Sequence, residues 1–133
     1  MKPHLHSRGS VRRYGGSVED YQAIHDFIDG SKSQLGDVRH RALLHSTWGI
    51  YIVERVFGAT LTNSDGKTVS VRDVAEGHVL EDMGTIPSAA DWLRSMPLAD
   101  WMGGIARLPK DHPARRHFGV GGTPILNGKD DYK

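Results

Sequence analysis

The fold is decided by residues 38–57, VRHRALLHSTWGIYIVERVF. This stretch contains no Pro and no cluster of turn residues, and its apolar side chains fall on one stripe of a helical wheel. Gly36 and Asp37 supply a start signal before it, and Gly58 supplies a C-cap after it. We therefore predict one helix over 38–57, the longest of the chain.

Capping and turn residues predict four further elements. A Ser followed three residues later by a carboxylate begins a helix, a Gly ends one, and β-branched residues around an Asn-Ser-Asp-Gly turn indicate paired strands. These signals give helices over 18–31 and 73–83, a hairpin over 59–72, and a fourth helix between Pro87 and Pro97. The predicted fold is mainly α, with a three- to four-helix core and a short β-hairpin.

The two ends of the chain lack a regular period. Residues 1–16 are polar, with Arg and Gly interleaved, and are predicted to form an irregular arm that docking on the helices must order. Residues 107–133 are rich in Gly and Pro and are predicted to be irregular or partly disordered. A single helical domain over 17–106 lies between them.

Composition narrows the classes of function. The chain has 133 residues and a formal charge of +1, so no global field recruits nucleic acid or an anionic membrane. It has no Cys, which excludes disulfides, thiol nucleophiles and sulfur-ligated metals. No stretch approaches the roughly 18 apolar residues of a membrane span, and no signal peptide begins the chain, so we expect a cytoplasmic protein. Eight histidines are the one compositional hint of chemistry.

The histidines of the 38–57 stretch fall on different faces of an ideal helix. His40 shares a polar face with Tyr51 and Glu54, whereas His45 lies within the apolar stripe. The two imidazoles are about 140° apart, so one straight helix should not offer both to the same ion. Both are expected to serve together only if a bend at Gly49 or a partner chain intervenes. The alternative for His45 is a core histidine satisfied by a neighbouring group.

Other histidines have neighbours with ligand chemistry. His78 and Asp82 are four residues apart on one helix face, where a carboxylate can orient an imidazole or share an ion with it. An ordinary surface pair explains that spacing equally well. His25 precedes an Asp, a pair that chance alone accounts for. His4 and His6 alternate in the arm, so a role for them is conditional on docking.

Three predicted helices therefore bring imidazoles toward one small core. We expect an N/O metal site suited to Zn, Mn, Fe or Ni, since no sulfur ligand exists. The candidate metal ligands are His25, His40, His45, His78 and Asp82, with His4 and His6 conditional. The candidate proton acceptors are Glu81 and Glu54, and the candidate phosphate-binding residues are Arg39, Arg41 and Arg72. The alternative for these arginines is a solvated helix face.

Several segments resemble a family of small uncharacterised proteins found largely in tailed-phage and prophage genomes. The segments are HLHSR, GGSVEDY, IHDFIDGSK, RHRALLH, FGATLTNSDGKTVSVRDV, EGHVLEDMG and IPSAADWL, in this order over residues 4–96. The resemblance implies expression in the cytoplasm of an infected bacterium and a role that helps a phage. It implies no particular activity.

Three functions remain open at this point. The first is a metal-dependent hydrolase acting on a nucleotide or another phosphate ester. The second is a binding protein that sequesters a nucleotide or blocks a host defence protein without turnover, and a homo-oligomer would suit it because a small chain encloses a pocket most easily between subunits. The third is a structural or accessory protein whose histidines only pack and cap.

Overall fold

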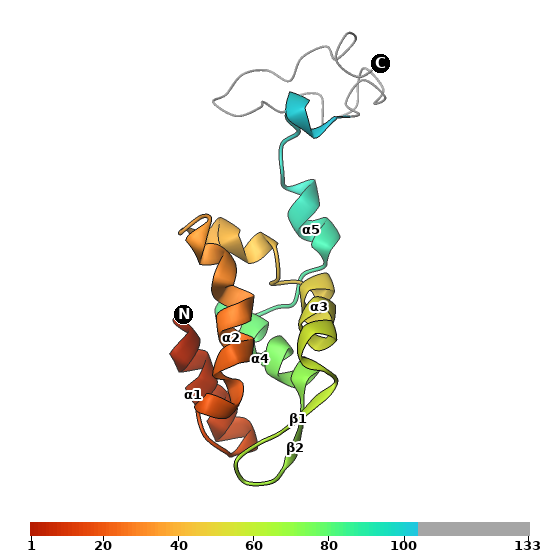
Figure 1. Ribbon diagram of the computed structural model, residues 1–133. Coiled ribbons are helices and arrows are strands. Elements are labelled where there is room, and N and C mark those ends of the chain that lie inside the picture. Colours follow the sequence, from red (N-terminus) through yellow and green to blue (C-terminus); the bar gives the residue numbers. More distant parts are fainter. Residues whose placement is uncertain (104–133) are drawn as a thin grey trace. The chain divides into compact units, whose positions relative to one another are not determined.

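The computed structural model describes residues 1–103 and is mainly helical, as predicted (Figure 1). The elements are α1 (Pro3–Tyr14), α2 (Glu19–Asp29), the 3₁₀ helices η1 (Gly30–Ser33) and η2 (Val38–Ala42), α3 (Thr47–Phe57), β1 (Thr60–Thr62), β2 (Thr68–Ser70), α4 (Val71–Met83), α5 (Ala89–Arg94) and η3 (Asp100–Met102). Residues Met1–Leu93 form one compact unit, and a second unit begins at Arg94. The tail predicted over 107–133 lies outside the described residues.

Helices α2 and α4 form the centre of the first unit. They contact each other, and each also packs against α1 on one flank and α3 on the other (Figure 1). Apolar side chains spaced along these helices make the core, which consists of Tyr21, Ile24, Ile28, Ile50, Val53, Val69, Val71, Val74, Ala75 and Val79. The helices predicted over 18–31 and 73–83 are confirmed within two residues at each end.

The single helix predicted over 38–57 is wrong. The chain forms the short helix η2, turns through residues 43–46, and begins again as α3. Ser46 starts the second helix, because its hydroxyl accepts a hydrogen bond from the amide of Gly49 at 3.0 Å. Gly49 makes the turn sterically feasible, since a Cβ atom there would collide with the backbone carbonyl of Leu44.

The N-terminal segment also differs from the expectation of an irregular arm. Residues Pro3–Tyr14 are the helix α1, which packs against α2 and α4. Its buried face carries small polar residues and one histidine, namely His6, Ser7, Gly9 and Ser10. A helix that buries Ser and Gly shows no apolar period in its sequence, although these residues allow close approach of another helix.

The predicted hairpin is confirmed. Strands β1 and β2 are antiparallel with Leu61 opposite Val69, and α4 begins directly after β2. The turn between the strands is tied to the start of α2, because Asp20 accepts hydrogen bonds from the amides of Ser17 at 2.7 Å and Ser64 at 2.9 Å. No helix in the described part of the chain has the length and apolar character needed to cross a bilayer.

Candidate metal centre

A cluster of buried histidines and aspartates lies where four elements of the first unit meet. We call it the His/Asp cluster; its members are His6 of α1, His25 and Asp29 of α2, His40 of η2, His45 of the turn before α3, and His78 and Asp82 of α4. Each imidazole is at most 5% exposed. Buried polar groups at this density are costly unless each one has a partner.

Asp29 is one of two carboxylates at the centre of the cluster. Its Oδ1 atom lies 3.2 Å from Nε2 of His78. The same oxygen lies 3.5 Å from Nε2 of His45 and 3.5 Å from Nε2 of His40. One carboxylate oxygen is therefore close to three imidazole nitrogens that come from three different segments.

Asp82 is the second central carboxylate. Its Oδ2 atom lies 2.9 Å from Nε2 of His45 and 3.3 Å from Nε2 of His78, and its Oδ1 atom lies 3.2 Å from Nε2 of His6. Burial tends to raise the pKa of Asp82, but the close imidazoles of His45, His6 and His78 outweigh it and hold this pKa well below its usual range. The carboxyl group is therefore ionised and available as a ligand.

Three of the imidazoles are oriented by contacts at the ring nitrogen that faces away from Asp29 and Asp82. His40 donates from Nδ1 to the carbonyl of Asp37 at 2.7 Å, and His6 contacts the Glu81 carboxylate through Nδ1 at 3.4 Å. His78 uses Nδ1 to contact His25 at 2.8 Å. This is the arrangement of metal-ligating histidines, in which an outer hydrogen bond fixes the ring and leaves Nε2 for the ion.

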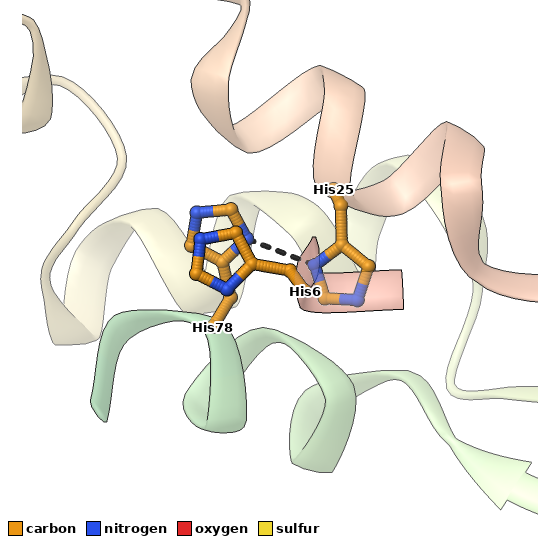
Figure 2. A group of neighbouring side chains, drawn as sticks. All are labelled: His6, His25 and His78. Carbon is orange, nitrogen blue, oxygen red and sulfur yellow. Dashed lines mark hydrogen bonds between the residues drawn. The ribbon is translucent and has the colours of Figure 1, made fainter. Parts of the chain in front are cut away.

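His25 is one of the groups that contact an imidazole on the side away from Asp29 and Asp82. Figure 2 shows its ring beside that of His78, with the His6 ring stacked on His78. Its Nε2 atom lies 2.8 Å from the hydroxyl of Ser10. Burial, helped by the neighbouring His78 and His6, lowers the pKa of His25 to about 3, so the ring is neutral. His25 therefore supports His78 and does not itself reach the two aspartates.

Several nitrogen atoms of the cluster make no hydrogen bond within the described residues, although two of them lie 3.2–3.5 Å from an aspartate oxygen. Nε2 of His6, Nε2 of His40 and Nδ1 of His45 are buried and form no hydrogen bond of good geometry. Ligand atoms of the imidazoles and the two aspartates also form groups whose members lie within 4.8 Å of one another. Unsatisfied lone pairs that converge in this way fit a cation.

Arg41 is the one predicted phosphate-binding arginine that approaches the cluster. Its Nη2 atom lies 3.9 Å from Oδ1 of Asp82, and its buried Nε atom has no hydrogen-bond partner in the described part of the chain. The side chain is 22% exposed, so it links the cluster to the surface. Arg39, by contrast, is exposed and pairs with Asp37 at 2.7 Å.

Four other predicted residues have different surroundings. Glu54 and Arg72 line a hollow of about 110 Å³ beside α3, and Arg72 also pairs with Glu76 at 3.1 Å. His4 is exposed. Glu81, predicted as a proton acceptor, contacts the outer nitrogen of His6 and lies 3.3 Å from Arg13, so it supports a ring of the cluster.

Asp29 is the member of the cluster that the sequence reasoning missed. It lies four residues after His25, the same spacing that singled out Asp82 after His78. That repeated spacing is the signal that could have found it. His45 joins the cluster together with His40 because the turn over 43–46 removes the geometry of one straight helix.

Comparisons with known proteins give a family and no activity. The model of a domain of unknown function, DUF6915, matches residues 1–102, a range that includes every member of the His/Asp cluster. No curated protein and no solved structure matches the chain.

Proposed function

We propose that this chain, which belongs to the DUF6915 family, binds a divalent transition metal in the His/Asp cluster. The observation that carries the proposal is the convergence of imidazole Nε2 atoms on Asp29 and Asp82, with outer hydrogen bonds on three of the rings. A bound cation would satisfy the buried lone pairs of His6 and His40. It would also offset the charge of two buried carboxylates.

The donor chemistry limits the choice of ion. Imidazole and carboxylate ligands without sulfur suit Zn, Mn, Fe or Ni, and they suit Ca and Mg poorly because those ions prefer all-oxygen shells. Zinc and manganese are therefore the first ions to test.

Metal analysis of the full chain, purified without a histidine tag, tests this proposal. We expect Zn²⁺ or Mn²⁺ to remain bound after gel filtration, and we expect Asp82→Asn to lose most of it, because Asp82 contacts three imidazoles. His4→Ala is the matched control, since this histidine is exposed and outside the cluster. Wild-type protein that holds neither ion after incubation and gel filtration would overturn the proposal.

A metal-dependent hydrolase is the second candidate, and Arg41 favours it. This guanidinium lies beside the cluster, is partly exposed and has an unpartnered Nε atom, so it can hold a phosphate oxygen. A bound ion lowers the pKa of a coordinated water and polarises a phosphoryl oxygen. Water would then add to phosphorus, the ester P–O bond would break, and the alcohol would leave with one proton of that water.

Incubating the metal-loaded protein with a panel of nucleotides and p-nitrophenyl phosphate tests hydrolysis. Arg41→Ala should abolish turnover while metal content stays the same, whereas Arg39→Ala should leave turnover unchanged because Arg39 is paired away from the cluster. Tight nucleotide binding without product would support the sequestering role instead. That role and a phage setting are further proposals, supported by the resemblance over residues 4–96 alone.

A further inference from the structure

We propose, on the basis of the metal site put forward above, that the His/Asp cluster holds two divalent ions bridged by Asp29 and Asp82. The donor atoms form three groups whose members lie within 4.8 Å of one another: two share Asp29, and the third consists of His6, His25 and His78. The two groups that contain aspartates are the ones suited to bridged ions. One contains His6, His78 and Asp82 with Asp29, and the other contains His40 and His45 with Asp29.

The first ion would lie between α1 and α4. The rings of His6 and His78 are stacked with their centroids 3.7 Å apart (Figure 2), and both present Nε2 to Asp82. Their Nδ1 atoms are engaged by Glu81 and His25 respectively, so each ring has one nitrogen left. Two oriented imidazoles and one carboxylate oxygen supply three of the four ligands of a tetrahedral shell.

The second ion would lie beside the turn over residues 43–46. His40 and His45 both place Nε2 at 3.5 Å from Oδ1 of Asp29, and their rings are nearly perpendicular with centroids 5.7 Å apart. The break between η2 and α3 brings these two histidines together. This pair therefore forms a second imidazole group on a separate part of the chain.

The aspartates connect the two groups. Asp29 contacts His78 of the first group as well as both histidines of the second, and Asp82 contacts His45 as well as His6 and His78. Carboxylates that face two sets of imidazoles are placed to bridge ions, which lie about 3.5–4 Å apart in two-metal sites. Each ion would then have two imidazoles and an oxygen from each aspartate. Asp29 would serve both ions through Oδ1, since its Oδ2 atom pairs with Lys32 at 3.4 Å.

A single ion accounts for fewer of these contacts. One tetrahedral ion that takes both aspartates has room for two imidazoles, so two of the four imidazoles that face the aspartates would hold no metal. The Nε2 atoms of His6 and His40 make no hydrogen bond in the described part of the chain, and the two residues belong to different groups. The two-ion arrangement uses both of these atoms.

The charge of two ions predicts an anion in the same place. Asp29, Asp82 and Glu81 carry three negative charges, which two divalent cations exceed. Further positive charge lies within 4 Å of these carboxylates, from Arg41, Arg13, Lys32 and the amino group of Met1. Uncompensated charge is costly in a buried site. Inorganic phosphate should therefore increase the occupancy of the second ion.

The number of bound ions tests the inference separately from the proposed function. We expect two Mn²⁺ per wild-type chain by elemental analysis with phosphate present, one in His40→Ala, and two in the His4→Ala control. Electron paramagnetic resonance of the wild type should show a spin-coupled pair, a readout that does not depend on any variant folding. One ion per chain with the spectrum of an isolated Mn²⁺ would overturn the two-ion site and leave the proposed metal binding intact. No bound ion would overturn both.

Discussion

Nδ1 of His25 lies 2.8 Å from Nδ1 of His78, and both rings are fully buried. One of the two nitrogens must carry the shared hydrogen. His25 is neutral because burial depresses its pKa, and its Nε2 atom is hydrogen-bonded to the hydroxyl of Ser10. If His25 donates that hydrogen bond, its Nδ1 accepts from His78, and Nε2 of His78 is directed at Asp29 and Asp82. His25 is thus a positioning residue for the cluster.

Replacing His25 should weaken metal binding without removing a ligand. We expect His25→Leu to raise the Kd for Zn²⁺ by about 10–100-fold, the usual effect of losing an outer hydrogen bond to a ligating histidine. Competition with a chromophoric chelator measures this change. Co²⁺ absorption spectra should also shift, because the ring of His78 loses its fixed orientation.

The matched variant for this prediction is His25→Gln, whose side-chain carbonyl can still accept a hydrogen bond from His78. It should recover part of the lost affinity. If Leu and Gln weaken binding equally, the hydrogen bond between the two imidazoles does not position His78, and bulk packing explains the loss.

Removing the metal should lower the thermal stability of the domain. A ligand that binds only the folded state stabilises it by about 2.7 kcal/mol at 100 times its Kd, which corresponds to roughly 10–20 °C in Tm for a domain of about 100 residues. We expect EDTA to lower the Tm by an amount of this order. Asp82→Asn should make the Tm insensitive to EDTA, and a wild-type Tm that EDTA leaves unchanged would contradict the prediction.

Local signals in the sequence are enough to predict most of the fold. The start of α2 is marked by Asp20, whose carboxylate accepts from the amide of Ser17. The turn at Asn63–Gly66 and Gly84 mark other element ends through backbone freedom, so α2, the hairpin and α4 could be placed without tertiary information. The break before α3 could not be placed in the same way. It depends on Gly49 passing beneath the carbonyl of Leu44, a contact that only the folded chain contains.

The candidate site was predictable to a smaller degree. The spacing of His78 and Asp82 indicated a shared role. In the structure Oδ2 of Asp82 lies close to Nε2 of both His78 and His45, and the rings of His78 and His45 are in contact. His6 was a candidate only on condition that residues 1–16 dock, because α1 buries small residues and has no apolar period that would predict its packing. The meeting of His40 with His45 was expected only with a bend at Gly49 or a partner chain, because one straight helix sets the two rings about 140° apart.

Asp20 should make stability depend on pH in the acid range. Hydrogen bonds from the amide of Ser17 and from Ser64 lower the pKa of Asp20 to about 2. A carboxyl group with a depressed pKa stabilises the folded state above its unfolded pKa of about 3.9, and this contribution is lost as pH falls toward 2. Asp20→Asn should therefore be less stable than wild type at pH 6, and the difference should shrink below pH 4.

Chemical denaturation of both proteins between pH 2 and pH 7 measures this difference. Asp26→Asn is the control on the same helix. Asp26 is exposed, and its carboxylate accepts a hydrogen bond from Gln22 of the same helix, away from the hairpin turn. A difference between wild type and Asp20→Asn that stays constant down to pH 2 would mean that the Asp20 carboxylate does not tie the hairpin turn to α2.

Gly49 should be the most sensitive glycine in the domain. A Cβ atom at this position would collide with the carbonyl of Leu44, and backbone cannot move aside as a flexible side chain can. We expect Gly49→Ala to destabilise the fold by roughly 3 kcal/mol, the upper end of the range for overpacking. It should also reduce metal content, because the turn it distorts carries His45.

Gly30→Ala is the control: Gly30 has helical backbone angles and open space around its Cβ position, so alanine there should be neutral or stabilising by about 0.4–1 kcal/mol. Thermal denaturation and metal analysis of the two variants in parallel check both parts. Equal stability of the two would show that the chain does not turn tightly at residues 43–46, and the pairing of His40 with His45 would lose its structural basis.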